Sequence, residues 1–307
     1  MQVLFAREQN AELTRNNLDN QLDRLLRSPG RAYLYHFLIL EEIAAKVDAE
    51  GAIKAAKHLP TEADRRFSRR FSESPIISAL LEDEELRKAI KTEKLEALID
   101  ADIITMAYGR LKSMPEYQDY VESVVEEEQE RLEEDRRIVQ TFFEACCWTD
   151  EDFDQHLEDV LSTWDEDADS VAPRILKALE SWKPGHPMDW RGMSIEPPEE
   201  SVEFVHELLD AGIRYEEELM ELIAPRLDNW EIDRISQMDR ILIRMALSEM
   251  LYFPNIPVKV SINEYIDISK HYSTPRSKDF VNGVLDNLLQ ALKTEGRIKK
   301  CGRGLVE

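Results

Sequence analysis

Apolar residues in this chain recur at the spacing of helices, and this pattern constrains the fold more than any other feature. The segment RSKDFVNGVLDNLLQAL, residues 276–292, shows it most clearly, because the gaps between its apolar positions run 1, 3, 1, 3, 1, 3. No stretch alternates convincingly between apolar and polar residues, as a half-buried strand would. Gly is also scarce, at 10 of 307 residues, whereas Glu, Leu, Ala and Arg are common. We therefore predict an all-α fold.

Proline and glycine residues predict where these helices begin and end. The stretch SWKPGHPMDWRGMSIEPP, residues 181–198, indicates a connector. After it we predict four helices, over about 199–226, 231–252, 258–272 and 275–292. Upstream we predict a break at SPGR, residues 28–31, a helix end at Gly51 and one long helix over 117–148.

The formal net charge of −24 argues against nucleic-acid binding over the whole surface, but the charge is unevenly distributed. Residues 121–170 hold 19 acidic and 3 basic side chains, a net charge of −16, whereas residues 256–303 hold 9 basic and 5 acidic ones, a net charge of +4. Nucleic-acid binding is therefore expected on only part of the surface. The acidic stretch could keep the protein soluble, repel nucleic acid or imitate it toward a basic partner.

The sequence carries no recognisable catalytic, cofactor or metal motif. None of the six histidines pairs with another at helical spacing, and neither GxGxxG nor GxxxxGK[ST] is present. The three cysteines include the neighbours Cys146 and Cys147 and lack CxxC spacing, which predicts free thiols in a reducing cytoplasm. No apolar run is long enough for a membrane span. We predict a cytoplasmic, non-enzymatic protein with no metal and no cofactor.

Three segments in the last third of the chain follow one another at short gaps: MDRILIRMALSEMLY at 238–252, IPVKVSINEYIDISKHY at 256–272 and SKDFVNGVLD at 277–286. Together they resemble the NusB family. The similarity extends over about 201–292, and QVLFAREQ at 2–9 resembles the end of the family's first helix. The resemblance implies a NusB-like helical bundle of two subdomains. It also implies a transcription antitermination factor, which binds boxA-type single-stranded RNA together with the ribosomal small-subunit protein NusE in the transcription elongation complex and so supports rRNA synthesis.

The extent of the resemblance also predicts a division of the chain into three parts. Residues 1–51 are expected to form the N-terminal helices of the NusB-like fold, and residues 197–307 its C-terminal helical subdomain. Residues 52–196 have no counterpart in the family, and we predict that they form an acidic helical insertion.

The resemblance places candidate RNA contacts at the starts of two helices. They are Gln2 and Phe5 on the first helix and Arg276, Ser277, Lys278, Phe280 and Asn282 on the last. Cations, a hydroxyl and the free N–H groups of a helix start suit phosphate contacts, and an exposed aromatic ring can stack on a base. Each residue also has a structural interpretation. Phe280 could be a core residue, Asn282 a cap to a neighbouring loop, and the charged residues ordinary solvated surface.

Two further residues are open to two interpretations. Asp239 matches an acidic position at which family members contact NusE, but it could instead form a surface ion pair with Arg240 or Arg244. Gly283 interrupts an amphipathic helix, where glycine costs about 1 kcal/mol relative to alanine. It lets either a neighbouring helix or the RNA backbone approach closely.

One departure from the family bears on the predicted function. Family members carry an Arg-rich stretch just before the first matched helix, and in this sequence Met1 already lies within that helix. Either the true start lies upstream, or this phosphate-binding element is missing. Loss of those phosphate contacts would lower RNA affinity by orders of magnitude at moderate salt. The alternative function is therefore a protein-interaction scaffold or ribosome-biogenesis factor with weakened or lost RNA binding. An rRNA-modifying enzyme would need a site for S-adenosylmethionine, for which the sequence has no motif.

Overall fold

The computed structural model describes residues 1–227, 235–274 and 276–305. Within these residues the regular structure consists of fifteen α-helices and short 3-10 or π turns, with no strand, so the all-α prediction is confirmed. Contacts between residues divide the chain into two compact units. Unit 1 comprises Met1–Arg24 and Pro198–Glu307, and unit 2 comprises Leu25–Pro197. No helix in the described part combines the length and the apolar character needed to cross a membrane.

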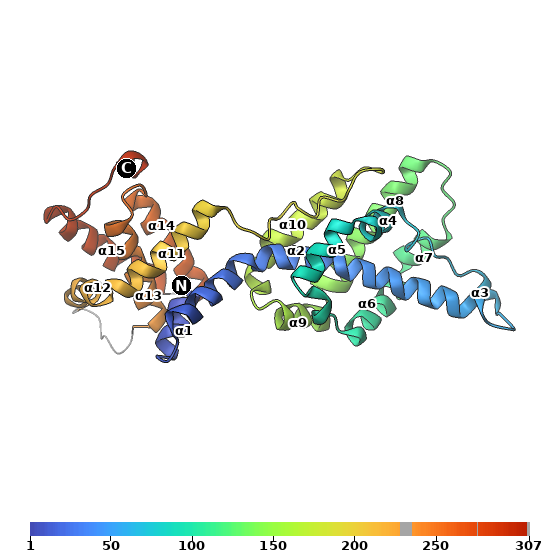
Figure 1. The fold of residues 1–307 in the computed structure, drawn as a ribbon, viewed down its shortest axis with the longest axis horizontal. Coiled ribbons are helices and arrows are strands. Elements are labelled where there is room, and N and C mark those ends of the chain that lie inside the picture. Colours follow the sequence, from blue (N-terminus) through green and yellow to red (C-terminus); the bar gives the residue numbers. More distant parts are fainter. Residues whose placement is uncertain (228–234, 275, 306–307) are drawn as a thin grey trace. The chain divides into compact units, whose positions relative to one another are not determined.

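The helices of unit 1 surround α13 (Gln237–Tyr252), as Figure 1 shows. Its other elements are α1 (Gln2–Gln9), the start of α2 (Arg15–Ala55), α11 (Glu199–Arg214), α12 (Glu216–Ile223), α14 (Val258–Tyr272) and α15 (Ser277–Thr294), with 3-10 turns at Ala224–Arg226 and Gly302–Leu305. Every residue from Ile241 to Met250 is buried, as expected for a helix covered on all sides. Two of these buried residues, Arg244 and Glu249, are charged and hold neighbouring helices through polar contacts.

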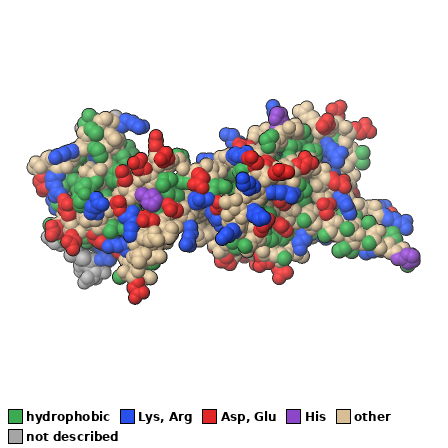
Figure 2. Space-filling model, viewed as in Figure 1, with side chains coloured by type: hydrophobic (Ala, Val, Ile, Leu, Met, Phe, Trp, Pro, Cys, Tyr) green, Lys and Arg blue, Asp and Glu red, His purple; other side chains and the backbone are tan. Residues whose placement is uncertain are grey.

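Unit 2 is built around the middle of α2, which is drawn in blue in Figure 1. Its other elements are α3 (Glu62–Arg65), α4 (Pro75–Glu82), α5 (Glu84–Thr92), a 3-10 turn at Leu95–Leu98, α6 (Ala101–Ser113), α7 (Pro115–Glu122), α8 (Glu128–Phe142), a π turn at Phe143–Trp148, α9 (Glu151–Val160) and α10 (Trp164–Ser181). Tyr33, Tyr35 and Phe37 are completely buried and belong to one continuous apolar core. On the face drawn in Figure 2, acidic side chains are scattered among basic ones over each unit.

The predictions for the helices after the connector agree with the structure in most places. Residues 182–198 contain no regular helix, and α14 covers the predicted 258–272. The helix predicted over 199–226 is divided at Tyr215 into α11 and α12. The helix predicted over 231–252 begins as α13 at Gln237, and its residues 231–234 lie outside the described residues.

The predicted break at 28–31 is wrong, because α2 continues through Pro29 and Gly30. A Cβ on Gly30 would lie 2.6 Å from backbone atoms of Ser194 and Ile195, so the glycine allows a close approach rather than a turn. The predicted helix end at Gly51 is also wrong, since α2 extends to Ala55 and Gly51 is buried against the side chains of Arg69 and Phe67.

The single helix predicted over 117–148 is wrong as well. The chain leaves helix after Glu122, and α8 begins at Glu128. Arg70 explains the interruption, because its Nη1 donates a 2.6 Å hydrogen bond to the carbonyl of Tyr120 and another to the hydroxyl of Ser123. A buried guanidinium from a distant part of the chain thus competes for the carbonyl groups at the end of α7.

The predicted three-part division, at 51/52 and 196/197, stays a prediction about domains. The two units meet within the sequence at 24/25, inside α2, and at 197/198.

Candidate nucleic-acid interface

The starts of α13 and α15 are joined by a cluster of hydroxyl groups around Asp239. The backbone N–H of Asp239 donates to Ser236 Oγ at 3.0 Å, so Ser236 caps α13. Ser277 Oγ donates to Asp239 Oδ2 at 2.9 Å, and Ser273 links the two serines at 3.1 and 2.8 Å. We call Ser236, Ser273, Thr274, Ser277 and Asp239 the hydroxyl cluster. It fixes the first turn of α15 relative to α13.

Three of the candidate RNA-binding residues are exposed on this fixed first part of α15. They are Arg276, Lys278 and Asn282. The positive end of the helix dipole favours an anion at this end, and two cations add to that preference. The arrangement therefore offers a phosphate group both charge and hydrogen-bond donors.

Ser277 and Phe280 occupy a different environment from these exposed neighbours. Ser277 is 2% exposed and donates its hydroxyl hydrogen bond to Asp239, so this contact positions the start of α15. Phe280 is 7% exposed and lies on the buried face of α15, as the core interpretation expects. Their direct contact with RNA stays a prediction.

Gln2 and Phe5 are both half-buried on α1, which packs against α13. The other end of α1 is held by charge. Arg244, 3% exposed on α13, contacts Glu8 at 2.8 Å and Glu216 of α12 at 2.6 Å. Arg7 contacts the same Glu216 at 2.7 Å. Helix α13 thus serves as the common support of α1 and α15.

Asp239 is not the surface residue that the sequence suggested. It is 4% exposed, bonds to Ser277 instead of Arg240 or Arg244, and its Oδ1 has no hydrogen-bond partner in the described part of the chain. The role of Arg244 was missed by sequence reasoning. An arginine inside the continuous apolar run of α13 was the available signal, because a buried guanidinium requires acidic partners.

Gly283 is exposed, and a Cβ added there would meet nothing within 4 Å. The interpretation that Gly283 lets a neighbouring helix approach is therefore wrong. The approach of RNA backbone at Gly283 stays a prediction.

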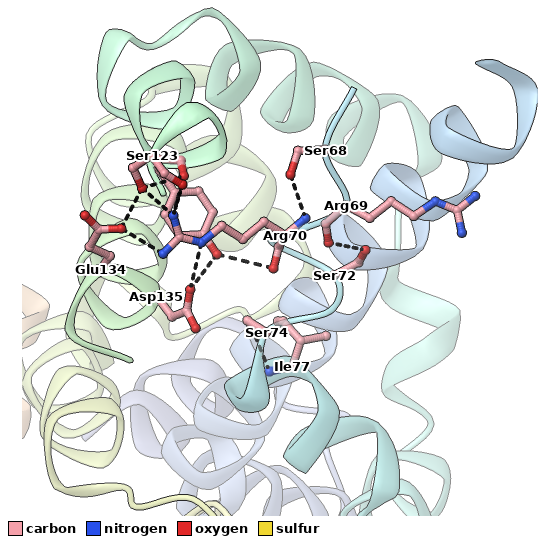
Figure 3. Close-up of polar contacts among 10 residues, drawn as sticks. Ser68, Arg69, Arg70, Ser72, Ser74, Ile77, Ser123, Glu134 and Asp135 are labelled. Atoms are coloured by element: carbon pink, nitrogen blue, oxygen red, sulfur yellow. Dashed lines mark hydrogen bonds and ion pairs between the residues drawn. The ribbon is translucent and has the colours of Figure 1, made fainter. Parts of the chain in front are cut away.

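Unit 2 contains a second polar cluster, shown in Figure 3, whose partners are internal. Arg70 is 7% exposed, and its Nη2 contacts Glu134 at 2.7 Å while its guanidinium lies 4.2 Å from the centre of the Tyr120 ring. Asp135 is 1% exposed and accepts a 2.7 Å hydrogen bond from Tyr120, and burial raises the pKa of its carboxyl group. This arrangement suits the packing of α7 against α8 rather than ligand binding.

Metal binding finds no support in the described residues, where no three His, Cys, Asp or Glu side chains are grouped as ligands. What the described geometry offers is an all-α unit that presents cations and helix-terminal N–H groups at the start of α15. That arrangement is typical of a helical protein that binds an anionic polymer through its surface.

Comparison with known proteins agrees with this class and makes it specific. A sequence model described as the NusB family matches residues 189–290, which include α13, α14 and α15. The transcription antitermination protein NusB of Desulfatibacillum aliphaticivorans is 36% identical over 132 residues, which are 43% of this chain and 86% of that protein. The chain therefore belongs to the NusB family.

Two other relatives are more similar over shorter stretches. The transcription antitermination protein NusB of Salinibacter ruber is 49% identical over 104 residues, which are 34% of this chain and 65% of that protein. The protein of the same name from Chloroherpeton thalassium is 43% identical over 105 residues, which are 34% of this chain and 50% of that protein. The match thus spans between half and two thirds of these two relatives. No solved structure matches the chain.

Proposed function

We propose that the protein is a NusB-type transcription antitermination factor that binds boxA-type single-stranded RNA together with the ribosomal protein NusE. The observation that carries the proposal is the exposed pair Arg276 and Lys278 at the start of α15, within the part of the chain that matches the family. Such a factor works as an adaptor in the transcription elongation complex, in the cytoplasm, and needs no catalytic group, metal or cofactor.

The proposed RNA surface uses the exposed groups of α15. Arg276 and Lys278 contact phosphates, Asn282 reaches a base or ribose, and the open space at Gly283 admits the RNA backbone. Gln2 and Phe5 extend the surface onto α1, and Ser277 holds the helix start in place through Asp239. Phe280, which is 7% exposed, joins this surface through its exposed part.

Asp239 is the proposed link to NusE. Its enclosed carboxylate accepts a hydrogen bond from Ser277 Oγ, so it would act on NusE binding by holding the starts of α13 and α15 together.

The direct test measures binding of a fluorescent boxA-like RNA to the full chain, alone and with NusE, over a series of salt concentrations. We expect binding that NusE strengthens. The double substitution Arg276→Ala/Lys278→Ala removes two phosphate contacts, so the slope of log affinity against log salt should fall by about 1.4 for a single strand. The matched control is Lys88→Ala/Lys91→Ala, which removes two exposed cations from α5 of unit 2 and should leave the slope unchanged.

A second function is favoured by the charge of unit 2, which has 39 acidic and 22 basic side chains and a net charge of −17. Such a surface suits basic protein partners better than RNA. If NusE binds the chain but RNA adds nothing and the slope is insensitive to Arg276 and Lys278, the protein is a protein-interaction scaffold instead. Absence of both RNA and NusE binding contradicts the adaptor proposal.

A further inference from the structure

Unit 2 contains a groove between one face of α4 and the connector that follows α10. Its volume is about 660 Å³, within the range of ordinary ligand pockets. The α4 side is formed by Pro75, Ala79 and Glu82, which recur at helical spacing. The connector contributes Trp182 and the turn Pro184–Pro187. We call this hollow the α4–connector groove.

The connector is anchored at both ends, so the groove is present before any partner arrives. Near its start, Trp182 Nε1 donates to the carbonyl of His186 at 2.7 Å, and Arg136 donates to the carbonyl of Trp182. Near its end, Trp190 Nε1 donates to Asp83 Oδ2 at 2.7 Å. A groove with fixed walls binds without the cost of ordering its own loops.

Four consecutive acidic residues, Glu82 to Glu85, form the rim of the groove. Two of them are already occupied: Asp83 caps α5 and accepts the Trp190 hydrogen bond, and Glu85 pairs with Arg191. Glu82 and Glu84 are exposed. Since unit 2 as a whole carries a net charge of −17, its field attracts cations to this rim and repels nucleic acid.

The chain itself shows how a basic side chain sits at this rim. The guanidinium of Arg191 lies 4.0 Å from the centre of the Trp190 ring and pairs with Glu85. Lysine and arginine cover apolar surface with their methylene groups while the charged end reaches a carboxylate. A groove with apolar walls and an acidic rim offers further places of the same kind.

We propose that the α4–connector groove binds an extended, basic peptide segment of a partner protein. Apolar or proline residues of the segment lie against Ala79, Trp182 and Pro187, and its lysine or arginine side chains pair with Glu82 and Glu84. The site belongs to unit 2, outside α13–α15, and does not rest on the RNA function proposed above.

The test uses the full chain and fluorescein-labelled synthetic peptides of repeated Arg-Pro-Leu triplets, with Glu-Pro-Leu peptides for comparison. We expect salt-sensitive binding of the basic peptide only. Glu82→Lys/Glu84→Lys should weaken it by about tenfold or more. The control Glu126→Lys/Glu127→Lys changes the net charge equally at two exposed residues between α7 and α8, and should alter affinity by less than about twofold.

A substitution that leaves charge unchanged separates the groove from the general acidic field. Ala79→Leu narrows the groove and should weaken peptide binding by about tenfold without changing its salt dependence. Equal losses in both charge variants, or no loss in Ala79→Leu, would overturn the proposal. The proposal would also be overturned if the chain bound single-stranded RNA and Ala79→Leu weakened that binding, or if the chain self-associated and Ala79→Leu abolished it. RNA or a second copy would then be the occupant of the groove.

Discussion

Units 1 and 2 are both helical, but they differ in what the buried charge does and in what the surface offers. In unit 1 one buried arginine, Arg244, ties α1 and α12 to a central helix whose sequence matches a known family. In unit 2 Arg70 ties a loop to two helices, and most of the unit lies outside the family match. Unit 1 has a net charge of −7 and unit 2 of −17. The difference separates two questions: how RNA and NusE are bound, and what the additional unit binds.

The largest expected effect concerns the buried charge of unit 2. Arg70→Met removes the only cation within 4 Å of Asp135 in the described residues and leaves Glu134 without its buried partner. We expect the free energy of unfolding of unit 2 to fall by about 3–5 kcal/mol. Denaturant unfolding followed by tryptophan fluorescence measures it, because four of the five tryptophans belong to unit 2.

The matched control for Arg70 is Arg66→Met. Arg66 also pairs with a glutamate, Glu62, but its side chain is 73% exposed. A surface pair of this kind contributes about 0.5 kcal/mol or less. If both substitutions shift the unfolding midpoint equally, the cluster in Figure 3 is not what holds α7 against α8.

The corresponding substitution in unit 1 is Arg244→Met. Glu8 and Glu216 then lose their buried partner, and we expect unit 1 to lose about 3 kcal/mol of stability and α1 to detach first. Hydrogen exchange of α1 and α13 amides measures this loss. Adding Glu8→Gln should restore part of it by removing the charge that is left without a cation, since Glu216 keeps Arg7, whereas a further loss would contradict the assignment. An unchanged tryptophan transition would show that unit 2 unfolds separately.

A pH-dependent effect is expected in unit 2 from two residues of α2. His36 donates Nδ1–H to the carbonyl of Ala32 at 2.7 Å and accepts from Trp148 Nε1 at 2.9 Å, and burial lowers its pKa to about 4. Only the unfolded state takes up this proton between pH 6.5 and 4, so His36 contributes stability above pH 6.5 that is lost as the pH falls, by about 1.4 kcal/mol per pH unit.

Glu41 acts in the opposite direction, because burial raises its pKa to about 7. Its ionisation lowers the stability of unit 2 as the pH rises from 4.5 to 7 and so offsets part of the His36 effect. We therefore expect Glu41→Gln to lose more stability than the original chain on acidification from pH 7 to 4.5. An NMR titration of the His36 ring should show no protonation above about pH 5. Equal pH slopes of the two proteins would contradict this account.

How far the sequence predicts the molecule differs between the units for physical reasons. In unit 1 the apolar spacing predicted both ends of α14 correctly, and three sequence segments in the family's order identified the family. In unit 2 Gly30 and Gly51 signalled helix ends, yet both lie within α2 because other parts of the chain pack against them. Local sequence does not contain those distant neighbours. The interruption after Glu122 has the same cause, since it depends on Arg70, which lies far away in sequence.

The candidate site was predictable in composition but not in environment. The residue types at the start of α15 and the position of Asp239 followed from the resemblance. Their burial could not be predicted: Ser277 and Asp239 are buried and hydrogen-bonded to each other, whereas Arg276 and Lys278 are exposed. The α4–connector groove combines residues about one hundred positions apart and could not be read from either segment alone.

The smallest expected effect concerns a pair of glycines, one in each unit. Gly283 in α15 and Gly109 in α6 both lie inside helices, and a Cβ at either would meet nothing within 4 Å. Alanine is preferred over glycine in a helix interior by about 1 kcal/mol, so Gly283→Ala and Gly109→Ala should each stabilise their unit by that amount. Thermal unfolding measures the gain.

RNA binding then distinguishes the two glycines. If the open space at Gly283 admits RNA backbone, Gly283→Ala should raise stability and still weaken RNA binding by about fivefold or more, whereas Gly109→Ala should raise stability alone. A gain in stability with unchanged RNA affinity in both variants would mean that the exposed glycine of α15 is not part of the RNA surface. Arg276 and Lys278 would then have to hold the RNA strand on the side of α15 that faces away from Gly283. A substitution that raises stability and weakens RNA binding therefore indicates that the glycine serves RNA binding, although it makes the helix less stable.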